Sequence, residues 1–110
     1  MGEFISKELK DFVKEGGVTL PKNLQIDDKE KRIYRRTVKL MEEVGEFSNA
    51  ILSHLGRQRT EKLNNYNPDN LPEEFADVLI TLLLIADMTE IDVDKAIELK
   101  MEKIRERFKK

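Results

Sequence analysis

The chain has 110 residues, of which 39% are apolar and 38% charged, with a formal net charge of −2 and no cysteine. This size allows one domain with a modest core, and the lack of cysteine excludes a disulfide framework, a thiolate zinc site and a cysteine nucleophile. The slightly acidic balance gives no general attraction to nucleic acid, and no apolar run approaches the ~20 residues of a membrane span, so we expect a cytoplasmic protein with neither nucleic-acid nor membrane partners.

The first half of the chain predicts two helices. Residues 3–14 carry apolar side chains at helical spacing and are followed by two glycines, and a proline-containing connector covers 16–25. A long helix is expected to begin after Asp27 or Asp28 and to end near Leu55, before Gly56. Its apolar stripe is Ile33, Leu40, Val44, Phe47, Ile51 and Leu55. We interpret residues 1–110 as a single domain, with 1–30 as N-terminal helix and connector and 31–110 as its core.

The second half predicts two more helices after a polar loop at 57–70, which makes the chain all-α. One begins at Asn70, with Pro72 in its first turn, and runs to about Met88. The last opens at Ile91-Asp92, with a stripe of Val93, Ile97, Met101, Ile104 and Phe108. Residues 75–86 read FADVLITLLLIA, which is apolar on nearly every side. Such a helix must be buried, either by its own chain or by a second subunit, and a buried Asp77 then needs a partner or a proton.

Two acidic pairs stand three residues apart on separate predicted helices, Glu43 with Glu46 and Glu74 with Asp77. If these helices pack antiparallel, four carboxylates converge and require positive charge, for which Mg²⁺ with its oxygen ligands and shared substrate phosphates is well suited. Each pair alone has an ordinary interpretation: a solvated helix face for the first, and an ion pair of Asp77 with Arg36 or a lysine for the second. Together they favour a divalent-cation site.

A basic row on the last predicted helix is formed by Lys100, Lys103 and Arg107, which share one face. Beside a metal site it would bind substrate phosphates; alternatively it is a solubilising row favoured by the helix dipole. His54 is the only histidine, which argues against a zinc site and against a carboxylate-bridged di-iron bundle. No glycine-rich phosphate loop is present.

The segments EEVGE (42–46) and EFAD (74–77) resemble the EExxE…ExxD signature of the MazG-like, all-α nucleoside triphosphate pyrophosphohydrolases, and their flanks extend the likeness over 36–108. The resemblance implies an antiparallel bundle of about four helices that forms homodimers or homotetramers. It also implies cleavage of a nucleoside triphosphate to the monophosphate and pyrophosphate with Mg²⁺, or Mn²⁺ as a substitute. The implied metal ligands are Glu43, Glu46, Glu74 and Asp77; Glu43 or Glu46 would orient the water, Glu42 would help, and Lys100 and Arg107 would lie near the phosphates.

Two departures from the family pattern leave base and sugar preference open: Ile104 stands where some relatives have asparagine, and Thr81 where some have an aromatic residue. The favoured role is cleaning of the nucleotide pool. Phosphoribosyl-ATP pyrophosphohydrolase of histidine biosynthesis is an alternative enzyme, and a non-catalytic helical oligomer is an alternative of another class. The attacked phosphorus, the number of metal ions and the choice between dimer and tetramer also stay open.

Overall fold

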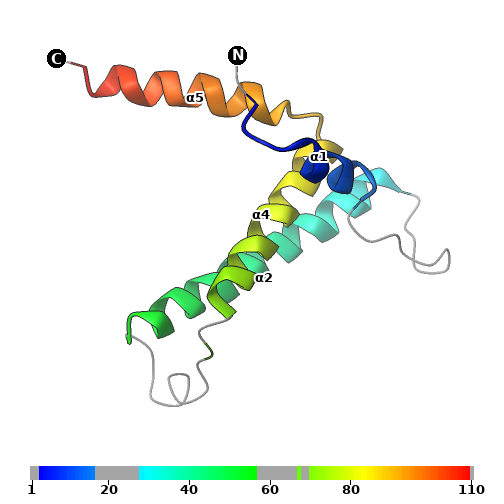
Figure 1. Ribbon diagram of the computed structural model, residues 1–110. Coiled ribbons are helices and arrows are strands. Elements are labelled where there is room, and N and C mark those ends of the chain that lie inside the picture. Colours follow the sequence, from blue (N-terminus) through cyan, green and yellow to red (C-terminus); the bar gives the residue numbers. More distant parts are fainter. Residues whose placement is uncertain (1–2, 17–27, 57–66, 68–69, 110) are drawn as a thin grey trace. The chain divides into compact units, whose positions relative to one another are not determined.

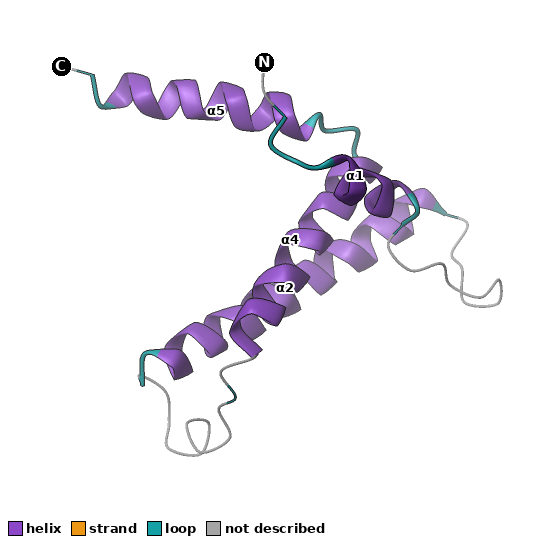
Figure 2. Ribbon diagram, in the orientation of Figure 1, coloured by secondary structure: helices purple, strands orange, loops and turns teal. Residues whose placement is uncertain are grey.

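The computed structural model describes residues 3–16, 28–56, 67 and 70–109. Within these ranges the regular elements are four helices, α1 (Lys7–Lys14), α2 (Lys29–His54), α4 (Asn70–Met88) and α5 (Val93–Arg107), as Figures 1 and 2 show. The all-α prediction is confirmed. None of the described helices is long and apolar enough to cross a membrane. Most of the predicted connector (16–25) and of the predicted loop (57–70) lies outside the described residues.

The helix ends follow the capping residues that the sequence offers. Asp28 Oδ1 accepts a hydrogen bond from the Lys31 backbone N–H at 3.3 Å, and Asp92 Oδ1 accepts one from Lys95 N–H at 3.2 Å. These bonds satisfy N–H groups that have no partner inside the helix. Gly56, directly after the last turn of α2, has a φ of +69°, a conformation that glycine adopts without strain. The predicted starts of α2 and α5 and the predicted end of α2 are confirmed.

The contacts divide the chain into two compact units. One comprises residues 26–82, with α2 and most of α4. The other comprises residues 1–25 and 83–110, with α1, the end of α4 and α5. The organisation of the chain as a single domain stays a prediction.

In the first unit α2 and α4 lie side by side and antiparallel (Figure 1). The rings of Phe47 and Phe75 meet edge to face, with centroids 5.9 Å apart. The stripe predicted for α2 is confirmed in part, because Ile33, Leu40, Phe47 and Ile51 are half-buried whereas Val44 and Leu55 are exposed. The buried residue of this helix is Glu43, so its less exposed side includes an acid.

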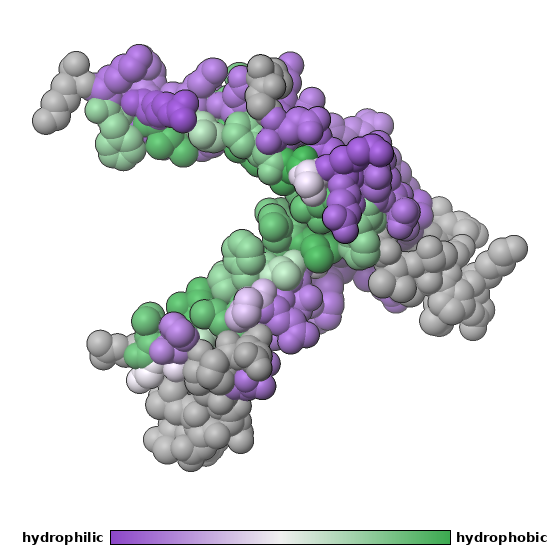
Figure 3. All heavy atoms as spheres, in the orientation of Figure 1, coloured by the Kyte–Doolittle hydropathy of each residue, from purple (hydrophilic) through white to green (hydrophobic). Residues whose placement is uncertain are grey.

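Parts of α4 stay open to solvent in this chain. Phe75 and Leu82 are about half exposed, at 53% and 49%, whereas Leu83, Leu84 and Ala86 are buried. Figure 3 shows hydrophobic surface along this helix. The sequence required burial of α4 by its own chain or by a second subunit, and the described residues of its own chain provide that burial only in part.

In the second unit Asp94, in the first turn of α5, binds the N-terminal segment. Its Oδ1 accepts hydrogen bonds from the backbone N–H groups of Phe4 and Ile5 at 2.8 and 3.2 Å, and its Oδ2 lies 2.7 Å from Lys10 Nζ. The hydrogen bond from Lys10 holds the pKa of Asp94 below its ordinary value, and the bond from Phe4 N–H adds to this effect. One carboxylate therefore connects the chain's start to α5.

The stripe predicted for α5 is not buried within the described chain. No residue of α5 is fully buried, and Ile104 and Phe108 are exposed. The periodicity correctly predicted a helix with an apolar face. It could not say which molecule covers that face, because period alone carries no information about the partner.

Candidate metal centre

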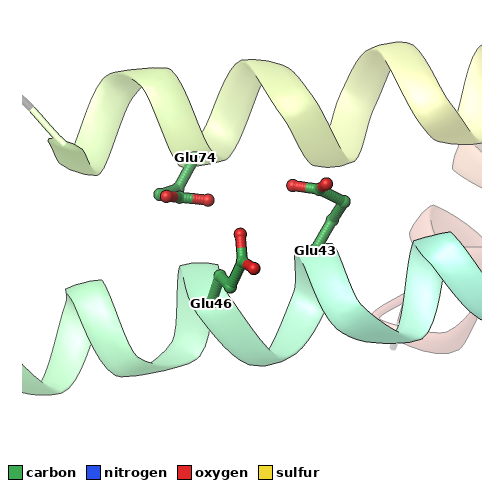
Figure 4. Close-up of side chains that lie close together, drawn as sticks. All are labelled: Glu43, Glu46 and Glu74. Atoms are coloured by element: carbon green, nitrogen blue, oxygen red, sulfur yellow. The ribbon is translucent and has the colours of Figure 1, made fainter.

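Three carboxylates converge between α2 and α4. Glu43 and Glu46 come from successive turns of α2 and Glu74 comes from the start of α4, and Figure 4 shows their side chains pointing toward one another. One carboxylate oxygen from each lies within 4.8 Å of the others. The i,i+3 spacing places the first two on one helix face, and the antiparallel packing brings the third opposite them.

The most buried member of this cluster is Glu43, at 6% exposure. Its Oε2 and the Oε2 of Glu74 are both buried and have no hydrogen-bond partner among the described residues. A buried oxygen that lacks a partner carries an uncompensated desolvation cost of about 1–3 kcal/mol, or more when it is charged. A cation placed between these carboxylates would satisfy both oxygens.

The cluster perturbs its own ionisation. Burial raises the pKa of the Glu74 carboxyl above its ordinary value, and the negative charges of Glu46, Asp77 and Glu43 raise it further, in that order. Neighbouring carboxylates therefore make the charged form of Glu74 costly in the absence of a cation. The same negative charges would attract a divalent ion placed between them.

The residues present fit a hard divalent cation. Carboxylate oxygens are the ligands that Mg²⁺ and Ca²⁺ prefer, and Mg²⁺ binds its oxygens at about 2.0–2.1 Å, so ligands on opposite sides of it stand about 4 Å apart. The three oxygens within 4.8 Å therefore need only a small side-chain adjustment to share one ion. Three carboxylates also leave positions open for water or for phosphate oxygens.

The other predicted site residues lie outside this cluster. Asp77 is exposed on the next turn of α4 and acts on the cluster through its charge on Glu74. Glu42 is exposed as well, and its Oε2 lies 3.5 Å from Lys39 Nζ. The basic row of Lys100, Lys103 and Arg107 is exposed on α5, in the other unit of the chain.

Comparison with known proteins supplies an independent observation. The MazG nucleotide pyrophosphohydrolase domain matches residues 34–110, more than two thirds of the chain. The chain belongs to the MazG nucleotide pyrophosphohydrolase family. No curated protein and no solved structure shows significant similarity to it. The MazG domain, residues 34–110, contains all three clustered carboxylates, whereas α1 precedes the domain.

Sequence reasoning missed one residue that touches the cluster of the MazG domain. Lys39 Nζ lies 3.1 Å from Glu43 Oε1, and the hydrogen bond to Glu43 raises the pKa of Lys39, with the charges of Glu43 and Glu42 adding to it. The signal was present in the sequence, because Lys39 stands four residues before Glu43 and three before Glu42, the two spacings at which helical side chains meet.

Proposed function

We propose that the protein is a divalent-metal-dependent nucleoside triphosphate pyrophosphohydrolase that cleaves a (deoxy)nucleoside triphosphate to the monophosphate and pyrophosphate. The observation that carries this proposal is the convergence of Glu43, Glu46 and Glu74 inside a MazG domain, where two buried oxygens have no hydrogen-bond partner in the described part of the chain. Mg²⁺ is the proposed cofactor and Mn²⁺ a substitute. A bound divalent ion supplies the concentrated positive charge that the oxygens of a triphosphate require as the anhydride bond breaks.

The proposed roles of the carboxylates follow from their exposure. Glu43 and Glu74, the more buried members, and Glu46 are assigned to holding the cation, with Asp77 as a fourth ligand on the neighbouring turn of α4. Glu46 is open to solvent, so it is the better placed of the two α2 carboxylates to orient a water and accept its proton. The water oxygen forms a bond to phosphorus, the anhydride bond between the α and β phosphates breaks, and the proton passes to Glu46.

The phosphates are assigned to the basic row of α5. Lys100, Lys103 and Arg107 are exposed cations on one helix, which supports a role in neutralising the charge of the triphosphate and of the departing pyrophosphate. Triphosphates and Mg²⁺ are both abundant in the cytoplasm, and we propose that the protein acts there to clear nucleotides from the pool.

A product assay tests the proposed reaction. The full chain is incubated with Mg²⁺ and a panel of ribo- and deoxyribonucleoside triphosphates together with phosphoribosyl-ATP, and both products are measured. We expect equal amounts of pyrophosphate and monophosphate from at least one triphosphate. Orthophosphate as the only product would reject the reaction type, and turnover of phosphoribosyl-ATP alone would replace the proposed substrate class. No turnover of any compound would favour a non-catalytic module.

We further propose that the protein self-associates as a homodimer or a homotetramer through a second apolar stripe of α2. This stripe is turned away from Glu43 and consists of exposed residues at alternating spacings of four and three, Tyr34, Val38, Met41 and Gly45. Met41, near its middle, is 71% exposed. No described side chain lies near Gly45, whose helical position costs about 1 kcal/mol relative to alanine, so the stripe leaves room for close approach of another helix.

Charge complementarity supports a second copy of the chain as the occupant. A groove of about 440 Å³ on this face is lined by Tyr34, Arg35, Val38, Lys39 and Glu42. Arg35 and Glu42 stand seven residues apart beside the stripe. In an antiparallel, two-fold pairing of α2 helices, Arg35 of each copy would face Glu42 of the other, so the surface is complementary to itself.

A pair of charge reversals tests this contact by sedimentation. Arg35→Glu and Glu42→Arg are each expected to weaken association by about ten-fold, because each places like charges together twice in a two-fold interface. The double variant restores opposite charges and is expected to associate like the unchanged protein. If both single variants associate normally, or if the double variant is no better than the singles, α2 is not the contact.

A further inference from the structure

The two oxygens of Glu43 have different surroundings. Oε1 lies 3.1 Å from Lys39 Nζ, whereas Oε2 is buried and has no hydrogen-bond partner among the described residues. The carboxylate itself extends toward α4, into the cluster with Glu46 and Glu74 (Figure 4). One oxygen is therefore anchored on its own helix, and the other remains available to the cluster.

We propose that Lys39 is a positioning residue that holds Glu43 through Oε1 so that Oε2 is presented to the cation. This inference rests on the proposed metal centre. Ligating carboxylates are commonly fixed by hydrogen bonds from outside the ligand shell, and such partners set the orientation of the ligand and thereby the affinity for the metal. Lys39 supplies this contact from one turn earlier on α2, at the i,i+4 spacing.

Lys39 has two opposed effects on a cation, and its neighbours decide between them. Its positive charge repels the ion, but Glu43 Oε1 at 3.1 Å and Glu42 Oε2 at 3.5 Å from Lys39 Nζ offset that charge. Its hydrogen bond acts on a Glu43 side chain that is only 8% exposed and therefore has little access to water as an alternative donor. Orientation therefore outweighs repulsion, and removal of Lys39 weakens metal binding instead of strengthening it.

The contact with Glu42 keeps Lys39 in place. Glu42 Oε2 lies 3.5 Å from the same ammonium, so Lys39 is held between two carboxylates of which only Glu43 belongs to the cluster. Two anchors restrict the rotamers of a long, flexible side chain and reduce the entropy that is lost when it fixes Glu43.

The experiment measures Mn²⁺ binding to the full chain by the electron paramagnetic resonance signal of free Mn²⁺, with no nucleotide present. Lys39→Met is expected to raise the dissociation constant about 10-fold, the lower end of the range for partners outside the ligand shell. Lys39→Arg keeps a hydrogen-bond donor, so its dissociation constant for Mn²⁺ is expected to lie closer to that of the unchanged protein. Lys31→Met removes an exposed lysine from the same helix and is the matched control, expected to bind Mn²⁺ normally.

Helix content, measured by circular dichroism at the binding temperature, separates positioning from unfolding, because a folded Lys39→Met variant that binds Mn²⁺ more weakly supports the inference. If Lys39→Met fails to fold, Lys39→Ala, which also lacks a donor, provides the same comparison. Unchanged or tighter binding in a folded variant overturns the inference, and tighter binding means that charge repulsion dominates. Absence of Mn²⁺ binding in the unchanged protein would instead overturn the proposed metal centre, so the two failures are distinguishable.

Discussion

Glu43→Gln is expected to lower kcat/KM for the preferred triphosphate by on the order of 10³-fold or more, the scale of loss when one preorganised electrostatic contact at a reacting centre is removed. The amide has nearly the same size, so packing between α2 and α4 is retained. It lacks the negative charge that a cation requires, and its NH₂ group would face the other acids. Steady-state kinetics with pyrophosphate detection measures the loss.

Glu73→Gln is the matched control for this substitution. Glu73 precedes Glu74, is exposed in the first turn of α4 and takes no part in the cluster. The kcat/KM of Glu73→Gln is therefore expected to stay within a few-fold of the value for the unchanged protein. The kcat/KM of Asp77→Asn is expected to lie between those of Glu43→Gln and Glu73→Gln, because Asp77 is exposed and acts on the cluster from the next turn of α4. Activity of Glu43→Gln equal to that of Glu73→Gln would remove the carboxylate cluster from the mechanism.

The second large effect concerns stability without metal. A carboxyl whose folded pKa is raised binds its proton more tightly in the native state than in the unfolded chain. Between the unfolded value of about 4.3 and the raised folded value of Glu74, the free energy of unfolding therefore decreases as the pH rises. We expect Glu74→Gln, measured in a chelator at pH 7, to melt at a higher temperature than the unchanged protein, and the difference to shrink as the pH is lowered toward 4.

Addition of a divalent ion is expected to reverse that order. Mn²⁺ at about 100 times its dissociation constant stabilises a folded state by ~2.7 kcal/mol, and each kcal/mol raises Tm by about 4–8 °C in a domain of this size. The unchanged protein should therefore gain roughly 10 °C or more at pH 7, and Glu74→Gln much less. If the ion raises Tm equally in both proteins, it binds elsewhere, and if Glu74→Gln melts lower without metal, the cluster is not under repulsion.

Much of the fold could be predicted because local signals determine helix ends. Asp28, Asp92 and Gly56 each act within one turn of the chain, so their effect depends on only a few residues that are adjacent in sequence. Which side of α2 is packed was harder to predict. Apolar side chains were used to find its packed face, whereas a functional helix can direct an acid such as Glu43 into that face.

The site was predictable in part for a related reason. Spacing on one helix indicated that Glu43 and Glu46 share a face, and the order of motifs along the chain indicated that Glu74 would join them. The exposure of Asp77 depends on how α4 is rotated against α2, which no single-helix pattern determines. Lys39 was not predicted, because a lysine one turn before an acid is also typical of an exposed helix surface.

The ring contact between Phe47 and Phe75 has a consequence for the neighbouring acids. Each ring directly follows a clustered carboxylate in sequence, Glu46 on α2 and Glu74 on α4. The aromatic pair therefore sets the register of the two helices at the point where the oxygens must meet. A slip by a single residue would displace one helix by about 1.5 Å along its axis and separate the ligands while leaving both helices intact.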